Sequence, residues 1–222
     1  GLESKNPAII LPDADMNLTV NECLLGTLSF NGQRCTALKM LFVHSKIKDE
    51  FLKKFSDAVD RIVIGMPWKK GVQVTPMPDE YKIKYMQELV DDAVAKGASI
   101  INQYGGQHVG TFYFPTILYP VSPGMKIYEE EQFGPVIPIL AYDNLETPVD
   151  YIVNSPYGQQ ASIFGTNPEA IAQLVDPLIN QVCRININSQ CQRGPDSYPF
   201  CGRKNSAEGT LSVFDALRAF SI

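Results

Sequence analysis

The sequence predicts an α/β fold with an open, largely parallel sheet that is covered by helices. Two observations favour this fold class. Short apolar runs with strand-like composition alternate along the chain with longer segments whose apolar residues recur every three to four positions. In addition, 45% of the 222 residues are hydrophobic, which is enough to bury one sizeable core. We therefore expect residues 1–222 to form a single domain.

The first half of the chain shows four regular segments. Apolar residues at 8–11 predict the first strand, and a mostly buried helix is expected over 16–30, with Asp13 or Asp15 as its N-cap. A second strand is expected at 38–43. Residues 46–63 have the most regular helical periodicity of the chain. Three prolines and two glycines within 65–78 predict a surface connection.

The second half repeats the alternation. A helix is expected over 80–96, where Gly97 is suited to end it. Strands are predicted at 98–101, 112–118, 136–142, 162–165 and 182–187, and helices near 145–154 and 167–178. Because strands and helices of this length alternate, most neighbouring strands should run parallel.

Composition argues against several classes of protein. The formal net charge is −5 and the basic residues form only short clusters, which is atypical of proteins that bind nucleic acids or membrane surfaces. No apolar run approaches the roughly 20 residues that a membrane-spanning helix needs. The five cysteines lack paired CxxC spacing, so we expect neither a metal site nor a disulfide scaffold. Free thiols fit a reducing, cytoplasmic setting.

Cys35 is the candidate nucleophile. A helical apolar run ends near Phe30, Asn31-Gly32 interrupts the chain, and the thiol follows in the stretch GQRC. Reactive side chains commonly lie on loops that regular elements hold in place, and a thiolate can add to a carbonyl carbon. The alternative is a buried cysteine that serves packing alone.

GQRC and the stretch EEEQFGP at 129–135 resemble the aldehyde dehydrogenase family, and KNP at 5–7 and PDAD at 12–15 occur in the family's order. The resemblance covers essentially the whole chain. In this family the cysteine attacks the aldehyde and the EExFGP glutamate reaches the nicotinamide ribose. The resemblance thus implies a small aldehyde as substrate, Cys35 as nucleophile, NADP or NAD as cofactor, and Glu131 with Phe133 as cofactor-binding residues.

The stretch QRGPD at 192–196 resembles the non-phosphorylating glyceraldehyde-3-phosphate dehydrogenases within the family. There, arginines matching Arg34 and Arg193 bind the substrate phosphate, a role that suits the forked guanidinium donors. The resemblance implies oxidation of glyceraldehyde 3-phosphate to 3-phosphoglycerate. Either arginine could instead form a surface or inter-domain ion pair. The open alternatives for function are a dehydrogenase of another acidic semialdehyde and a non-catalytic structural or interaction protein on the same scaffold.

The chain departs from the family pattern in two places. Where the family writes ELGGK, residues 1–5 read GLESK, so the position of the general base falls on Gly1. Glu3 lies on the same face of an extended strand and is the candidate base, with an ordinary surface carboxylate as the alternative.

The second departure is the absence of a GxGxxG turn. The family places its cofactor fold upstream, so we expect a catalytic-domain fragment whose cofactor is held mainly by an upstream domain outside this chain. The resemblance also implies a homodimeric or homotetrameric full-length protein.

Overall fold

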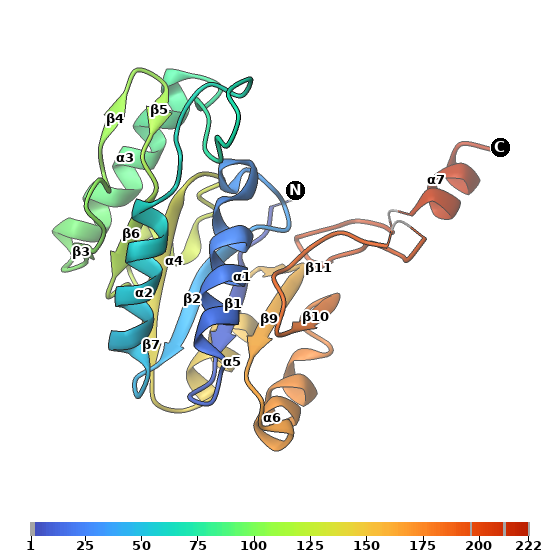
Figure 1. Cartoon of the computed structure of the whole chain (residues 1–222). Coiled ribbons are helices and arrows are strands. Elements are labelled where there is room, and N and C mark those ends of the chain that lie inside the picture. The colour runs from blue at the N-terminus through green and yellow to red at the C-terminus, as the bar shows by residue number, and fades with distance from the viewer. Residues whose placement is uncertain (1–2, 196, 211, 222) are drawn as a thin grey trace.

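The computed structural model describes residues 3–195, 197–210 and 212–221. A seven-stranded sheet forms the centre of the molecule (Figure 1), and every neighbouring pair is parallel except the antiparallel edge pair β6–β3. The strand order across the sheet is β10 (Arg184–Ile187), β9 (Gln160–Phe164), β1 (Asn6–Ile10), β2 (Leu38–His44), β7 (Val136–Tyr142), β6 (Thr116–Tyr119) and β3 (Ser99–Ile100). The predicted fold class is confirmed.

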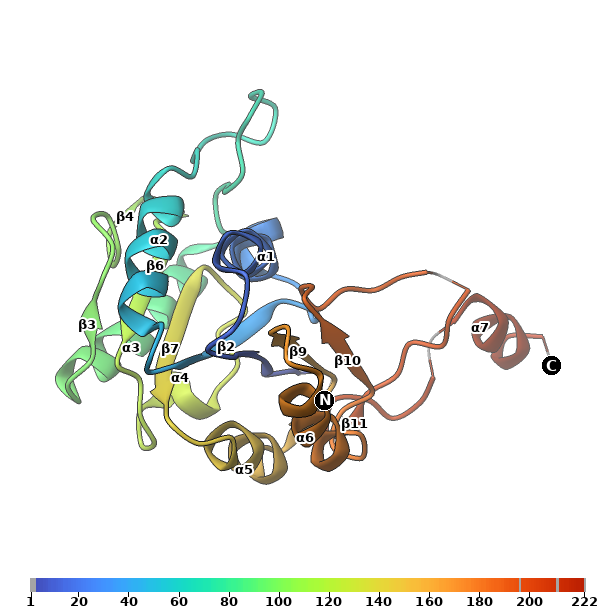
Figure 2. The same ribbon diagram turned by 60° about the horizontal axis from the view of Figure 1, so that its bottom comes forward.

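Helices cover both faces of the sheet, as Figure 2 shows. One face carries α1 (Met16–Leu28) and α2 (Lys48–Asp60), and the other carries α3 (Glu80–Ala95), α5 (Glu146–Asn154) and α6 (Pro168–Leu178). Successive residues of a strand point to opposite faces of the sheet. Ala8 and Ile10 therefore pack in the core beneath α1 and α2, whereas Ile9 packs in the core beneath α3, α5 and α6. Burial on both faces explains why these strands read as continuous apolar runs.

Of the two predicted N-caps, Asp15 marks the start of the first helix and Asp13 does not. Asp15 is the N-cap of α1, since its carboxylate accepts the Leu18 N–H at 2.9 Å. Asp13 serves a different junction: it accepts the backbone N–H groups of Thr166 and Asn167 at 2.8 and 2.5 Å. The loop before α1 is thereby fastened to the loop before α6.

Several boundaries differ from the sequence prediction. The expected strand at 112–118 is divided into β5 (Phe112–Tyr113) and β6, with Pro115, which lacks an N–H, between them. The helix expected to reach residue 30 ends at Leu28 and continues as the 3₁₀ turn η1 (Ser29–Gly32). The sequence prediction missed the short elements α4 (Lys126–Glu129), β4 (His108–Val109), β8 (Tyr157–Gly158), β11 (Arg203–Lys204) and α7 (Val213–Ala219).

The chain leaves the sheet after β10 as a C-terminal arm, residues 188–221, and α7 stands clear of the body in both views (Figures 1 and 2). The arm contacts the body near its start, where Cys191 is buried in a core and the Gln190 N–H donates to Glu22, and again through β11, which pairs antiparallel with β8. No residue of α7 is buried. Among the described residues, none of the helices has the length and apolar character needed to cross a membrane.

Candidate active site

Three segments meet at the edge of the sheet where the parallel strands begin. Ser4 precedes β1, Cys35 precedes β2 and Glu131 precedes β7. Because β1 and β7 flank β2, the segments that enter these strands lie side by side. Open α/β sheets usually bind ligands at the opposite, carboxyl edge, so the site is defined by its side chains and not by the general rule for this fold.

The loop that carries Cys35 reverses direction through three consecutive residues with positive φ: Phe30 at 55°, Asn31 at 60° and Gly32 at 70°. Asparagine tolerates this conformation, and the Asn31 side chain is also bonded to Thr75, whose backbone N–H donates to Oδ1 at 2.9 Å. At Gly32 a Cβ atom would lie 2.7 Å from the carbonyl oxygens of Thr27 and Gly134. A glycine is therefore required where the GQRC loop packs against the EQFG segment.

The backbone of Cys35 is fixed by side chains from two strands. Its carbonyl oxygen accepts hydrogen bonds from Asn6 Nδ2 at 2.7 Å, from Lys39 Nζ at 3.2 Å and from the Ser4 hydroxyl. Asn6 also binds the carbonyl of Ala37 at 3.0 Å. The residue itself is only partly buried. The thiol is thus presented from a constrained backbone.

Glu131 belongs to the same network. One carboxylate oxygen, Oε1, accepts from Lys39 Nζ at 2.6 Å and from the Ser4 N–H at 3.0 Å. The backbone carbonyl of Glu131 accepts from the Tyr85 hydroxyl at 3.0 Å. Within the described part of the chain, no group donates to the second oxygen, Oε2. One side of the carboxylate is therefore anchored and the other is available to a ligand.

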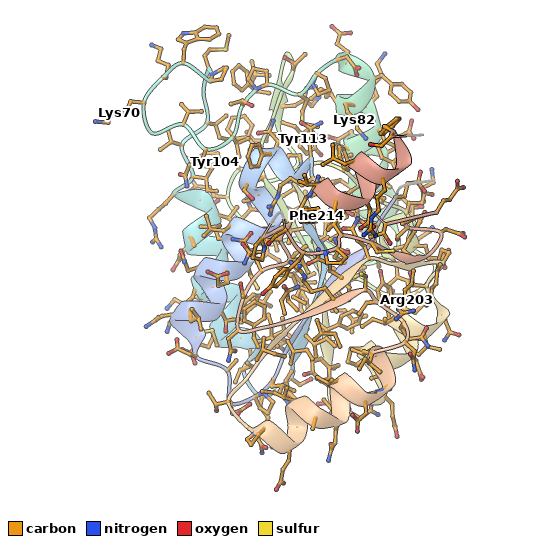
Figure 3. All side chains as sticks on the ribbon, turned by 90° about the vertical axis from the view of Figure 1, so that its right-hand side faces the viewer. Lys70, Lys82, Tyr104, Tyr113, Arg203 and Phe214 are labelled. Atoms are coloured by element: carbon orange, nitrogen blue, oxygen red, sulfur yellow. The ribbon has the colours of Figure 1, made fainter. Side chains whose placement is uncertain are left out.

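Glu131 opens into a pocket of about 490 Å³ whose lining residues are Glu3, Tyr81, Lys82, Tyr85, Glu131 and Phe133. Phe133 has a positive φ of 42°, and the ammonium groups of Lys39 and Lys82 lie 5.6 and 5.8 Å from the centre of its ring. Figure 3 labels Lys82 on α3. Glu3, the predicted base, lines the same pocket as both predicted cofactor-binding residues, and its carboxylate accepts the Tyr157 hydroxyl at 2.7 Å.

Burial shapes the charges around the pocket. Desolvation lowers the pKa of Lys39, and the nearby carboxylate of Glu131 opposes this shift. The pKa of Lys82 is lowered by desolvation as well. Desolvation, followed by the hydrogen bond to Glu3, raises the pKa of Tyr157 to about 12. Tyr157 is therefore a neutral hydrogen-bond donor at ordinary pH.

The two predicted phosphate ligands lie in different surroundings. Arg34 is half-buried, with Nη2 3.1 Å from Gln190 Oε1 and 3.4 Å from the Gly26 carbonyl oxygen. Its Nε is buried and finds no acceptor among the described residues. Arg193 is exposed on the arm, where its guanidinium lies 5.3 Å from the centre of the Phe200 ring. The structure brings Arg34 to the start of the arm, whereas Arg193 stacks further along it.

Sequence reasoning overlooked Lys39, Ser4 and Asn6, which hold the site together. One signal was available for Lys39. It is the only charged residue in the strand LKMLFVH, and a lysine within a buried strand needs a partner because an isolated buried charge is very costly. No comparable signal marks Ser4 or Asn6. The position of the missing family base, Gly1, lies outside the described residues.

The fold and site define an α/β domain in which a partly exposed cysteine on a constrained loop shares hydrogen-bond partners with an anchored carboxylate. A family model described as "Aldehyde dehydrogenase family" matches residues 1–222. The chain belongs to the aldehyde dehydrogenase family.

Similar proteins agree on the fold and the family. An NADP-dependent glyceraldehyde-3-phosphate dehydrogenase of Streptococcus equinus is 33% identical over 99% of this chain and 45% of its own length. A sulfoacetaldehyde dehydrogenase of Neptuniibacter caesariensis is 31% identical over 99% of this chain and 47% of its own. The crystal structure of an NADP-dependent glyceraldehyde-3-phosphate dehydrogenase from Bacillus halodurans C-125, complexed with NADP, superposes with a TM-score of 0.91 at 35% identity, covering 97% of this chain and 44% of that one. The chain thus spans less than half the length of these relatives.

Proposed function

We propose that this chain is the thiol-bearing catalytic domain of an NAD(P)-dependent aldehyde dehydrogenase whose substrate is an anionic aldehyde, with glyceraldehyde 3-phosphate as the first candidate. The observation that carries the proposal is the shared network of Cys35 and Glu131, in which Lys39 and Ser4 contact both residues. A nucleophile and a cofactor ligand need this proximity because hydride transfer requires the reacting groups to be held together.

The residues present fit a nicotinamide cofactor. The free oxygen of Glu131 faces a pocket that Phe133 also lines, and a carboxylate of this kind can accept hydrogen bonds from vicinal ribose hydroxyls. When bound, the cofactor supplies the acceptor for the hydride of the aldehyde carbon. NADP is the favoured form, since the similar enzymes from Streptococcus equinus and Bacillus halodurans are NADP-dependent. Most cofactor contacts would come from a domain upstream of this chain.

The thiol supplies the covalent chemistry. The Cys35 thiolate adds to the aldehyde carbon to give a thiohemiacetal, which oxidation converts to a thioester, and water then releases the carboxylic acid. Glu3 is the proposed base for that water. Its carboxylate lies in the pocket with Glu131 and is oriented by the Tyr157 hydroxyl. If Glu3 is the base, Glu3→Gln should leave the first turnover rapid and slow the later ones.

Arg34 and Arg193 are the proposed ligands of the anionic group. The unpaired, buried Nε of Arg34 supports an acceptor at this position, since buried donors rarely remain unsatisfied. The relatives support an anionic substrate class, because the names of two similar enzymes specify a phosphorylated and a sulfonated aldehyde. The second candidate function is therefore oxidation of a different acidic aldehyde bound through Arg34 alone.

Kinetics of the intact protein test the proposal. Wild type should reduce NADP in the presence of glyceraldehyde 3-phosphate, and Cys35→Ser should abolish this reduction. Arg193→Ala should lower kcat/KM for the phosphorylated aldehyde roughly tenfold or more, the cost of a lost charge-assisted hydrogen bond, while sparing succinate semialdehyde. An unchanged kcat/KM for both substrates would favour the second candidate, and equal losses on both would argue against a phosphate-specific role for Arg193. No aldehyde-dependent reduction with any acidic aldehyde would favour a non-catalytic protein on this scaffold.

Two further properties of the intact protein are proposed with the activity. We expect a homodimer or homotetramer, which the exposed apolar arm supports. The partly buried Cys35 and the separate, unbridged cysteines fit a reducing compartment such as the cytoplasm.

A further inference from the structure

Lys39 occupies an irregular position in β2. Asn6 of β1 lies opposite Leu38, but the next residue, Pro7, lies opposite Met40, so Lys39 is the extra residue of a β-bulge between the two central strands. A bulge redirects a side chain that would otherwise follow the alternation of the strand. The strand supplies apolar residues to both cores, and the bulge turns its one lysine toward the entering loops.

The Lys39 ammonium has three donors, and three acceptors surround it: the carbonyl oxygen of Cys35, Oε1 of Glu131 and the hydroxyl of Ser4. The side chain is 1% exposed, so this charge is taken out of water and has one carboxylate to balance it. Every donor is directed at the nucleophile loop, at the cofactor-binding carboxylate or at the residue that joins them. A lysine that only filled space in the core would not need to contact both of these groups.

We propose that Lys39 is a positioning residue that sets the distance and orientation between the Cys35 loop and the carboxylate of Glu131, with Ser4 as the link between them. The inference rests on the proposed function, because it gives these two groups their catalytic roles. Lys39 is 1% exposed and is not among the residues that line the pocket. It acts by holding Oε1 of Glu131, which leaves Oε2 directed to the pocket, and by holding the carbonyl that precedes Thr36.

A matched control, Lys5, lies directly before the neighbouring strand β1. Lys5 is 3% exposed, and its ammonium binds the Glu130 carbonyl oxygen at 2.5 Å and Gln132 Oε1 at 2.7 Å. Lys5 therefore loses its hydration as Lys39 does, yet it contacts neither the Cys35 loop nor the Glu131 carboxylate. Effects of removing a buried ammonium can thus be separated from effects of removing the bridge.

The experiment compares Lys39→Met with Lys5→Met in the intact protein. Two measurements avoid turnover: the Kd for NADP from a fluorescence titration, and the rate of Cys35 alkylation by iodoacetamide without cofactor. Lys39→Met should raise the Kd and slow the alkylation, each about tenfold, as expected for the loss of hydrogen bonds to a charged group. Lys5→Met should change both by less than about threefold, although both variants lose thermal stability.

A double-mutant cycle tests the bridge directly. If Lys39 acts on the cofactor through Glu131, Lys39→Met/Glu131→Gln should bind NADP no more weakly than the worse single variant, because groups in one network are not additive. Additive losses would overturn the proposal. Identical effects of Lys39→Met and Lys5→Met would also overturn it, since burial of an ammonium would then explain both.

Ser4→Ala gives a second route if Lys39→Met does not fold. It removes the hydroxyl that contacts the Cys35 carbonyl, Lys39 and, at 3.3 Å, Oε1 of Glu131, but keeps the backbone N–H that binds the same Glu131 oxygen at 3.0 Å. Alkylation of Cys35 should slow several-fold while the Kd for NADP stays within about twofold. The reverse pattern would reject the assignment. If the wild type binds NADP and oxidises an aldehyde, and Lys39→Met has the same Kd and alkylation rate, only this inference is refuted. Wild type that binds no NADP refutes the proposed function as well.

Discussion

At the scale of single residues, burial divides the cysteines into two groups. Cys23 and Cys191 are fully buried, whereas Cys35, Cys183 and Cys201 reach solvent. Desolvation raises the pKa of Cys191 to about 12 and raises the pKa of Cys23 as well. A thiol reacts through its thiolate, so these two cysteines should be inert wherever the domain is folded.

Alkylation should follow this division. Iodoacetamide at pH 8 should modify Cys35, Cys183 and Cys201 and spare Cys23 and Cys191, as counted by peptide mass spectrometry. Raising the pH to 9 should not change the pattern, because the pKa of each buried thiol lies well above 9. A substrate-like aldehyde should protect Cys35 alone. Modification of Cys191 as fast as Cys35 would show that the start of the arm is not packed against the core, and equal labelling of all five would argue against Cys35 as the nucleophile.

The sequence indicates candidate site residues more readily than the contacts between them. Cys35 and Glu131 stand out through neighbouring residues in their own motifs. Their shared contacts arise because β1, β2 and β7 are adjacent, and strand order is a tertiary property that motifs do not encode. The bulge at Lys39 depends on the register of two strands about 30 residues apart in sequence. A lone lysine in an apolar strand therefore indicates that a partner exists, but the sequence does not show which residue that partner is.

At the scale of elements, the turn between α1 and β2 controls how the Cys35 loop meets the 131–134 segment. Gly32→Ala should destabilise the domain for two reasons: the positive φ of 70° disfavours alanine, and the new Cβ would meet two backbone carbonyls at 2.7 Å. We expect a loss of about 2–4 kcal/mol in the free energy of unfolding, measured by urea denaturation. Cys35 alkylation should slow as well, because the carbonyls can yield only by moving the loop.

Gly110→Ala separates the two reasons. Gly110 also has a positive φ, 55°, but a Cβ there would meet nothing within 4 Å. Gly110→Ala should lower the free energy of unfolding by roughly 1–2 kcal/mol through backbone strain alone, with no change in the reactivity of Cys35. Equal losses of unfolding free energy for Gly32→Ala and Gly110→Ala would show that the contact between residue 32 and the Gly134 carbonyl oxygen is readily relaxed.

Asp13 joins two loops at the far edge of the sheet. Its slight burial raises its pKa, but the hydrogen bonds from Thr166 and Asn167 outweigh this effect, so the pKa lies below its usual value. A carboxyl group with a depressed folded-state pKa contributes stability above its unfolded pKa, and that contribution is lost as the pH falls through the folded value. Asp13→Asn should therefore reduce the urea midpoint at pH 7 and have little effect at pH 2.5. Asp143→Asn, at another exposed carboxylate, is the control. A loss that is equal at both pH values would show that the charge of Asp13 is unimportant.

The sequence predicted helices and strands correctly where the element is long and its pattern depends on neighbouring residues in the sequence. The periodicity of α2 and α3 and the apolar run of β7 mark these elements closely, because their burial pattern repeats along the sequence. The missed strands β4, β8 and β11 have two residues each. Such strands exist only through a partner, as β11 does through β8, and nothing in a two-residue segment indicates its partner.

At the scale of the whole molecule, the C-terminal arm is the part that the domain leaves uncovered. Figure 3 looks onto this side, with Phe214 labelled on α7. The side chains of Phe214, Leu217 and Phe220 are 64%, 59% and 91% exposed. Contiguous apolar side chains of this size on a soluble protein commonly mark an interface. This supports the proposed oligomer, in which the arm of one copy would be covered by another copy.

Substitutions on α7 test this idea without altering the sheet. Phe214→Ser/Leu217→Ser should lower the mass of the intact protein from that of a dimer or tetramer toward that of a monomer in light scattering, because each copy loses two large apolar contacts. The circular dichroism of the body should remain unchanged, since α7 contributes no buried residue to either core. Val109→Ser is the matched control, because Val109 is 69% exposed on β4, away from the arm. An unchanged mass in the α7 variant, or an equal decrease in the control, would assign the subunit contacts to another surface.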